Sequence, residues 1–157
     1  MKIPDALEHP ERYPGLAERK LPRVLLRIWC YPSFDPYRSW AAIQAREGLF
    51  LRRIVWDQGR TGRLKPTTYG SEVPLEHSVF DELVADLQAI ELPPFLAVST
   101  IGLDGTSYGV ETGSYMLSAR LAWWQTPPEA WEPLRNWHAR ASALFDSLLP
   151  TATPEFD

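Results

Sequence analysis

The chain has 157 residues, 45% of them hydrophobic and 12% aromatic, and a formal net charge of −4. This composition excludes a disordered chain, and the length fits one domain that buries about two thirds of its unfolded surface. No apolar run approaches the roughly 20 residues of a membrane helix, and the charged N-terminus lacks the apolar stretch of a secretory signal.

The first third of the chain predicts an arm followed by three strands. Residues 1–22 hold four of the fifteen prolines and show no sustained periodicity, so we expect an extended arm with one helical turn. The β-branched and aromatic residues of 24–31 predict the first strand. Segments 38–46 and 49–56 predict two more strands, which form a hairpin that turns on Gly48.

The middle of the chain predicts a long loop and then a helix. Residues 58–76 contain three Gly and two Pro, which indicates a loop. Ser78 then predicts the N-cap of a helix, with Asp81 three residues later as a variant of the capping box. Apolar residues recur at a spacing of three to four, and Pro93-Pro94 should end the helix.

The last third predicts three strands and a second helix. The strand segments are 95–103, 106–112 and 115–124, with hairpin turns at Asp104-Gly105 and Gly113-Ser114. Pro133 cannot donate an amide hydrogen, so the regular helix should begin there, with Pro133 in its first turn. The apolar stripe of this helix consists of Leu134, Trp137, Ala141, Leu144, Phe145 and Leu148.

These elements predict an α+β fold: an antiparallel sheet of about six strands in two three-stranded meanders, two main helices on one face, and an extended N-terminal arm. We expect the arm in residues 1–22, a single domain in residues 23–150 and a tail in residues 151–157. The order strand-strand-strand-helix occurs twice, in residues 23–92 and 93–150, as an echo of order without any repeated run of residues.

Charge is sorted along the chain. Residues 21–65 carry nine Arg or Lys against three acids, a net of +6, whereas residues 66–157 carry three Arg against thirteen acids, a net of −10. Such asymmetry indicates a partner without naming it. The single cysteine, Cys30, cannot form an internal disulfide and suits a reducing compartment, so we expect a cytoplasmic protein and a buried structural thiol.

Alternation along the first three strands assigns their side chains to two faces. One face suits the helices and collects Val24, Leu26, Ile28, Cys30, Ala41, Ile43, Ala45, Leu49, Leu51 and Val55. The opposite face places arginines among aromatic residues, and its candidate binding residues are Arg27, Trp29, Arg38, Trp40, Arg46, Arg52 and Trp56. Arg53 falls on the apolar side, so we expect it near a sheet end or paired with an acid.

This Arg/Trp face has several interpretations. Arginines beside aromatic rings can stack on bases and neutralise phosphates, but the isoelectric point near 5.4 disfavours nucleic acid. The same side chains can form cation–π pairs with one another. The N-terminal arm, the 58–77 loop or a second copy of the chain can also cover them, and we favour such a structural or oligomeric role over a docking surface.

The loop segment 58–65 is a candidate anion site. It combines two Gly with the cations Arg60, Arg63 and Lys65, whose neighbouring backbone amides could cradle a phosphate or a carboxylate. It lacks the Gly-Lys-Ser/Thr ending of a Walker loop. A flexible, solvated loop is the simpler interpretation.

No arrangement of residues predicts catalysis, a metal site or a cofactor. His9, His77 and His138 are isolated, without His-x-x-x-His or Cys-x-x-Cys spacing. We expect His138 to be a partly buried, hydrogen-bonded residue beside the apolar stripe and His77 to lie on the surface. No nucleophile with a base in reach is visible, because Cys30 is expected to be buried and no Gly-x-Ser-x-Gly occurs.

One pattern in the C-terminal half combines a turn, a tryptophan pair and a helix start: Leu103-Asp-Gly-Thr-Ser-Tyr108, Trp123-Trp124 and Pro128-x-x-Trp131-x-Pro-Leu134. It resembles a pattern in small uncharacterised bacterial α+β proteins, some of which are similar to immunity proteins that neutralise toxins. The resemblance covers residues 95–148. It implies a hairpin followed by a helix, and no catalytic residues.

We expect a non-enzymatic interaction protein, immunity-like or regulatory, whose Arg/Trp face or acidic C-terminal half docks on an unknown protein or on a second copy of the chain. The alternative is a protein that binds a small molecule or an anion in an Arg/Trp-lined cleft, which Trp124 would join. A third hypothesis is an enzyme whose site is assembled in space. A broad exposed patch would favour the first hypothesis and a concave cleft the second.

Overall fold

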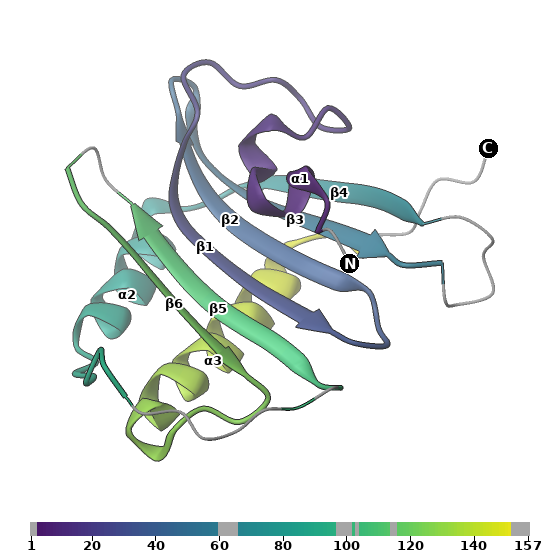
Figure 1. Ribbon diagram of the computed structural model, residues 1–157. Coiled ribbons are helices and arrows are strands. Elements are labelled where there is room, and N and C mark those ends of the chain that lie inside the picture. Colours follow the sequence, from purple (N-terminus) through teal and green to yellow (C-terminus); the bar gives the residue numbers. More distant parts are fainter. Residues whose placement is uncertain (1–2, 60–65, 97–101, 103, 114–115, 152–157) are drawn as a thin grey trace.

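The computed structural model describes residues 3–59, 66–96, 102, 104–113 and 116–151, and these form one six-stranded antiparallel sheet with helices (Figure 1). The strands are β1 (Arg23–Pro32), β2 (Tyr37–Ala45), β3 (Gly48–Asp57), β4 (Thr67–Pro74), β5 (Thr106–Gly113) and β6 (Ser118–Trp124). Their order across the sheet is β4-β3-β2-β1-β5-β6. The predicted α+β class is therefore confirmed.

The predicted hairpin at Gly48 is present. Ala45 pairs with Gly48, so a turn of two residues, Arg46 and Glu47, joins β2 to β3. Gly48 has a φ of +145°, a backbone conformation that residues with a Cβ rarely adopt. This short turn fixes the register of the two strands and thereby which of their side chains are neighbours.

Within the described residues, the sheet has four strands before the first long helix and two after it, where the sequence predicted three and three. β4 lies within segment 58–76, whose composition predicts a loop. β4 is an edge strand, and edge strands tolerate residues such as Gly70 and Pro74 that weaken a central strand. The strand formers in this segment, Thr67, Thr68 and Tyr69, were a signal for β4 that the glycines and prolines outweighed.

The strand predicted for residues 95–103 is absent from the described part of this segment. Phe95, Leu96 and Gly102 lie outside strands, and the remaining residues lie outside the described ranges. The predicted turn at Asp104-Gly105 joins no hairpin, because β5 pairs with β1 and β6. Instead, the backbone N–H and the hydroxyl of Ser33, just after β1, donate to the Gly105 carbonyl. β5 and β6 form the second predicted hairpin, and the chain between them begins after Gly113.

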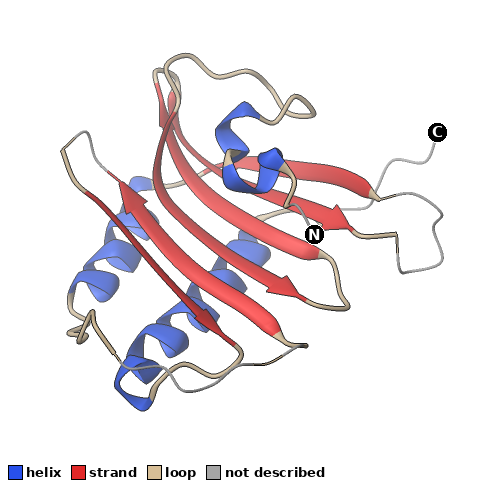
Figure 2. Cartoon of the chain, viewed as in Figure 1, coloured by secondary structure: helices blue, strands red, loops and turns tan. Residues whose placement is uncertain are grey.

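Two long helices cover one face of the sheet (Figure 1, Figure 2). They are α2 (His77–Gln88) and α3 (Glu132–Leu148), and the short helix η2 (Glu129–Trp131) precedes α3. The core between sheet and helices includes Leu26, Ile28, Leu51, Leu83, Val110, Trp137 and Phe145. Burying one large apolar side chain contributes about 1.5–3 kcal/mol, so contact with the sheet stabilises both helices.

The two helix starts differ in how well the sequence predicts them. Pro133 lies in the first turn of α3, as its missing amide hydrogen predicts. Ser78 is not a cap but lies inside α2, whose N-cap residue is Glu76. The N–H of Phe80 already donates to the Glu76 carbonyl, so the first helical turn begins two residues before the predicted cap.

The N-terminal segment lies on the opposite face of the sheet from α2 and α3 (Figure 2). It contains α1 (Asp5–Glu8) and the short helix η1 (Pro10–Arg12). Leu7 is fully buried and belongs to a second apolar cluster, together with Trp29, Tyr31, Ile54 and Trp56. The predicted arm with a helical turn is therefore present, and it covers the sheet.

The predicted faces are right for β3 and, beyond the bulge at Val24–Leu26, for β1, but wrong for β2. Trp40 belongs to the helix-side core, whereas alternation placed Ala41 there. Direct cross-strand partners share a face, and Trp40 pairs with Ile28 of β1 and Arg53 of β3. β2 is buried on both faces along most of its length, so its apolar residues do not alternate with polar ones. The pattern therefore does not indicate which side of the sheet each residue faces.

Candidate functional site

The chain itself covers most of the predicted binding face. Trp29 is 2% exposed and Trp56 is 8% exposed, both within the apolar cluster under the N-terminal segment. Arg27 and Arg52 are equally buried. A docking surface needs accessible side chains, so these four residues form an internal seam between the sheet and the N-terminal segment.

The Arg52 guanidinium holds the N-terminal segment on the sheet. Its Nη1 donates to the carbonyl oxygens of Pro10 and Glu11 at 3.0 and 3.1 Å, and its Nη2 donates to the carbonyl oxygen of Ala17. Its Nε donates to the Glu72 carboxylate on β4. Arg52 therefore bonds backbone groups that would otherwise be buried without partners, and it does so across two elements and a loop.

A carboxylate between two arginines completes this contact. Glu72 accepts hydrogen bonds from Arg52 and from Arg19, whose guanidinium lies 3.8 Å from the centre of the Phe50 ring. Burial opposes ionisation of Glu72, but the hydrogen bonds from Arg19 and Arg52 outweigh it and hold the pKa of this carboxyl below its usual value. The positive charge of Arg52, which the sequence assigned to a binding face, is thus neutralised inside the molecule.

Arg27 makes the same kind of contact from β1. Its Nη1 donates to the Leu7 carbonyl at 3.0 Å, and its Nη2 donates to the Glu111 carboxylate at 2.6 Å. The Arg27 guanidinium lies 4.7 Å from the centre of the Trp29 ring, and that of Arg120 on β6 lies 4.9 Å from the same ring. Mutual cation–π contact, one of the interpretations of the Arg/Trp pattern, is therefore present here.

The remaining predicted site residues lie elsewhere. Trp40 and Arg38 are on the helix side of the sheet, and Arg46 is exposed at the turn between β2 and β3. The candidate anion-loop residues lie outside the described ranges: Arg60, Arg63 and Lys65. The structure therefore does not bring the seven predicted residues together on one face.

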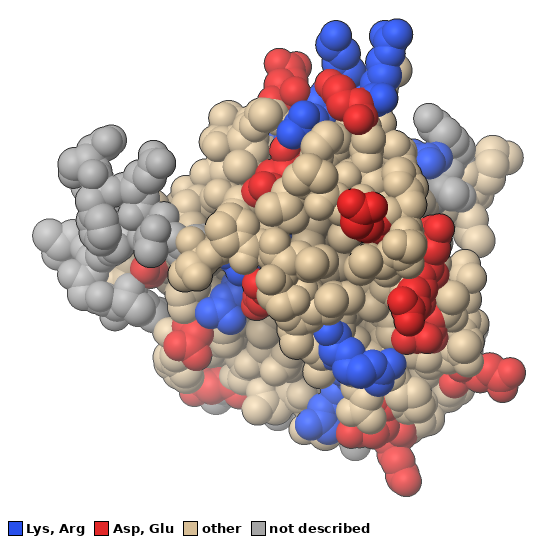
Figure 3. Space-filling model, turned by 180° about the vertical axis from the view of Figure 1, so that it is seen from behind, with Lys and Arg blue, Asp and Glu red and all other residues tan. Residues whose placement is uncertain are grey.

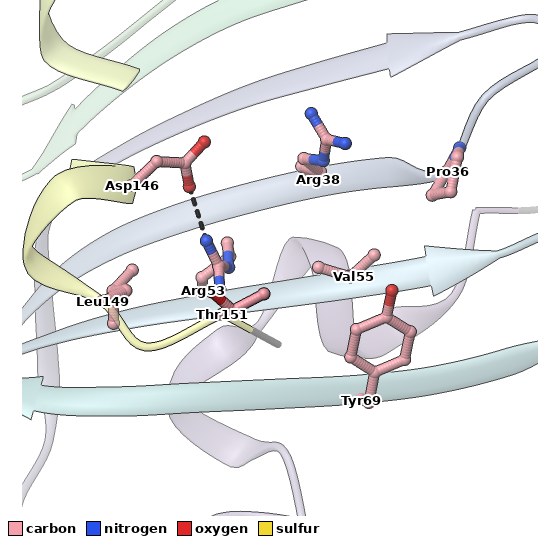
Figure 4. A pocket seen from close by; sticks show the side chains of 8 residues that line it. All are labelled: Pro36, Arg38, Arg53, Val55, Tyr69, Asp146, Leu149 and Thr151. Carbon is pink, nitrogen blue, oxygen red and sulfur yellow. Dashed lines mark hydrogen bonds and ion pairs between the residues drawn. The ribbon is translucent and has the colours of Figure 1, made fainter. Parts of the chain in front are cut away.

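A cavity of about 290 Å³ lies where β2, β3 and β4 meet the C-terminal end of α3 (Figure 4). Its lining residues are Pro36, Arg38, Arg53, Val55, Tyr69, Asp146, Leu149 and Thr151. The strand register creates its floor, because Val55 pairs with Arg38 on one side and with Tyr69 on the other. Arg53 lies two residues before Val55 on the same face of β3.

The two arginines of this cavity differ in their partners. The Arg53 side chain is 9% exposed, and it donates from Nη1 to Asp146 at 2.7 Å and from Nη2 to the Pro150 carbonyl at 2.6 Å. The prediction that Arg53 pairs with an acid is thus confirmed. The buried Nε of Arg53 has no acceptor among the described residues. Arg38 is exposed, and within the described ranges it forms no hydrogen bond or ion pair.

The surface around α2 is acidic. Its exposed carboxylates belong to Glu76, Asp81, Glu82, Asp86 and Glu91. No Lys or Arg occurs between Lys65 and Arg120, and no ion pair joins any of the five acids to another described residue. Figure 3, which views the molecule from the helix side, shows acidic atoms along this flank at the right. Phe95, shortly after α2, is 93% exposed.

Two titratable groups lie between the sheet and the helices. His138 is 3% exposed, and its Nε2 donates to the Trp29 carbonyl at 3.0 Å, since a carbonyl oxygen can only accept. Burial lowers the pKa of His138 to about 4, despite this hydrogen bond, so the ring is neutral at pH 7. Burial raises the pKa of the half-buried Cys30 thiol to about 11, which keeps the thiol protonated and unreactive.

Other sites remain without support. His77 is exposed at the start of α2, as the sequence predicts. Among the described residues, no three His, Cys, Asp or Glu side chains are grouped to hold a metal ion. No described helix has both the length and the apolar character needed to cross a membrane.

Comparison with protein-family models, with curated proteins and with solved structures finds no match to this chain.

Proposed function

We propose that this protein acts by binding another protein, and that the acidic surface around α2 makes the contact. The observation that carries the proposal is the set of five exposed carboxylates on and beside α2, which no described cation neutralises. Elsewhere the buried arginines of the sheet already have acidic or carbonyl partners within the molecule. Three cations of the basic half, Arg27, Arg52 and Arg53, are thus paired internally. The five acids on and beside α2 face solvent instead.

The arrangement of these acids supports contact with one basic surface. Successive helical residues are rotated by about 100°, so Asp81, Glu82 and Asp86 lie within an arc of about 140° on α2. Uncompensated charges of one sign attract a surface of opposite charge and accelerate association with it. The exposed Phe95 ring beside this surface offers an apolar anchor of the kind that interface centres use.

An inhibitor of the immunity type is one instance of such a protein. The resemblance of residues 95–148 to immunity-like proteins favours this instance. The same residues contain no catalytic motif, as expected for an inhibitor. The free Cys30 thiol suits a cytoplasmic setting. The hypothesis of an Arg/Trp-lined cleft on one face of the sheet loses support, because Trp29 and Trp56 are buried under the N-terminal segment. Arg38 and Trp40 lie on the other face of the sheet.

The test is to capture the partner with the tagged chain from a lysate of the source organism, purify it, and titrate it calorimetrically at two salt concentrations. We expect a basic protein, whose binding weakens with salt. The variant Asp81→Asn/Glu82→Gln/Asp86→Asn removes the charges on one arc of α2. It should weaken binding at least tenfold and reduce the salt dependence.

A matched variant removes three exposed acids elsewhere: Asp35→Asn/Glu47→Gln/Glu129→Gln. Both variants change the net charge by the same amount, so a general charge effect would weaken binding equally in both. The proposal requires the second variant to bind within about twofold of the wild type. A partner that lacks a basic surface, or one that binds the α2 variant with unchanged affinity, would contradict it.

A further inference from the structure

The cavity between β2, β3, β4 and α3 has the charge and shape of a site for a small anion. We propose that it binds a monocarboxylate carried on a compact apolar group. This site lies on strands and on the C-terminal end of α3, so it is separate from the acidic surface proposed for protein binding. The inference goes beyond that function, and either can hold without the other.

Charge balance sets the ligand's charge. Asp146 accepts hydrogen bonds from Arg53 at 2.7 Å and from the Trp40 indole at 2.8 Å, so its negative charge is compensated. Arg53 and Asp146 together are neutral, which leaves Arg38 as the surplus cation of the cavity wall. One uncompensated positive charge favours one negative charge on the ligand.

The donors of the cavity suit a carboxylate. The Arg53 guanidinium is fixed by Asp146 and by the Pro150 carbonyl, and its buried Nε–H has no acceptor within the described ranges. A buried donor without an acceptor costs free energy, which a nearby negative charge reduces. Arg38 contributes a guanidinium free to form a charge-assisted pair, and Tyr69 contributes a hydroxyl.

The remaining wall sets the body of the ligand. Pro36, Val55 and Leu149 are apolar and lie around the same space as the donors (Figure 4). A volume of about 290 Å³ is at the lower end of the range for small-molecule sites, so it suits a ligand of about the size of benzoate. An apolar ring against Val55 and a carboxylate against the neighbouring Arg38 would use both the apolar and the charged parts of the cavity.

The test titrates benzoate into the ¹⁵N-labelled full chain and follows the amide signals by NMR, with benzamide as the neutral compound of the same shape. We expect saturable benzoate shifts confined to the cavity segments, and binding of benzamide at least tenfold weaker. Arg38→Gln should weaken benzoate binding at least tenfold, since it removes the surplus charge from an exposed side chain that holds no other described residue. Tyr69→Phe should weaken it severalfold.

The matched control is Arg140→Gln, which removes an exposed arginine from α3 outside the cavity. It should bind benzoate as the wild type does, and so should the α2 variant with three acids removed. Three results would each overturn the proposal: shifts that do not saturate, equal binding of benzoate and benzamide, or equal weakening by Arg38→Gln and Arg140→Gln. Tryptophan fluorescence checks that every variant is folded. A loss of benzoate binding in a folded variant can then be assigned to the changed side chain.

Discussion

A glycine decides how closely the buried Trp29 indole approaches the sheet. Gly109 of β5 pairs with Trp29 of β1, and a Cβ built on Gly109 would lie 1.9 Å from Cζ2 of the Trp29 indole. No real side chain fits at that distance, so the ring occupies the space that the missing Cβ leaves. The stacking of Arg27 and Arg120 on Trp29 depends on this position of the indole.

Gly109→Ala should therefore destabilise the protein by about 1–3 kcal/mol, the usual cost of forcing extra atoms into a packed interior. Gly113→Ala, in the same strand, is the control, because among the described residues its Cβ would meet only the Val24 carbonyl oxygen at 3.7 Å, an ordinary contact. Urea denaturation of both variants measures the difference in unfolding free energy. Equal midpoints for the two variants would show that Trp29 does not need the space at Gly109.

At the same scale, the sequence predicts single residues of the cavity but not the cavity. Alternation placed Arg53 on the apolar side of β3, and the need to neutralise it predicted an acidic partner. That partner, Asp146, is 93 residues away in the chain, and only the packing of α3 on the sheet brings the two together. Trp40 was assigned to the wrong face for a related reason, because both faces of β2 are buried and its apolar residues do not alternate.

At the scale of elements, the N-terminal segment behaves as a further layer of the fold. Its two short helices total seven residues, too few to be stable alone. They persist because the sheet supplies an apolar cluster beneath them and two arginines that donate to their carbonyl oxygens. Four of the seven residues predicted as a binding face form the sheet's side of this contact: Arg27, Trp29, Arg52 and Trp56.

Arg52→Gln tests that contact. It removes one of the two guanidinium partners of Glu72, which keeps Arg19, and it leaves three backbone carbonyls without this donor. Each buried acceptor left without a donor costs about 1–3 kcal/mol, so the total cost is roughly 3–5 kcal/mol. We expect a loss of unfolding free energy of that size and easier quenching of tryptophan fluorescence by iodide, as Trp29 and Trp56 become accessible. Arg46→Gln, at an exposed position, should change stability by less than about 0.5 kcal/mol. Unchanged quenching in Arg52→Gln would mean that the segment stays in place without this arginine.

Elements whose sequence signal is local were predictable, and those that depend on distant partners were not. The hairpin at Gly48 and the start of α3 at Pro133 follow from backbone preferences of single residues. β4 was missed because its pairing with β3 and its contact with the N-terminal segment stabilise a sequence with weak strand propensity. Gly70 lowers the strand propensity of β4, but the packing there requires a glycine, since a Cβ would lie 2.9 Å from Ile54 and 3.1 Å from Leu16.

At the scale of the whole molecule, a buried hydrogen bond links strand β1 at the centre of the sheet to helix α3. His138 of α3 donates to the backbone of Trp29 in β1, and its ring stands edge-on to Tyr108 and Trp123 at 5.5 and 5.4 Å between ring centres. A charged imidazole would have to be desolvated here, whereas a neutral one fits. Folding is therefore coupled to the protonation state of this residue.

The sign of that coupling follows from the two pKa values. The pKa of His138 is about 4 in the folded chain and about 6.5 when the ring is exposed. Between pH 6.5 and pH 4, the unfolded chain therefore binds a proton at this residue that the folded chain does not bind. The stability that this neutral histidine provides is complete above pH 6.5 and is lost as the pH falls from 6.5 to 4. Between pH 7 and pH 5 the loss amounts to about 2 kcal/mol. The stability that comes from the lowered pKa of the Glu72 carboxyl is present above its usual value of 4.5 and is lost only as the pH falls below that value.

Urea denaturation at pH 7 and pH 5 therefore measures His138 in a window that excludes Glu72. His138→Gln keeps an N–H donor for the Trp29 carbonyl but cannot titrate, so most of the difference between the two pH values should disappear in this variant. His77→Gln changes an exposed histidine on α2 and should keep the full difference. If His138→Gln lost as much stability on acidification as the wild type does, the pH dependence would arise elsewhere, and the buried ring would be coupled to folding through its shape alone.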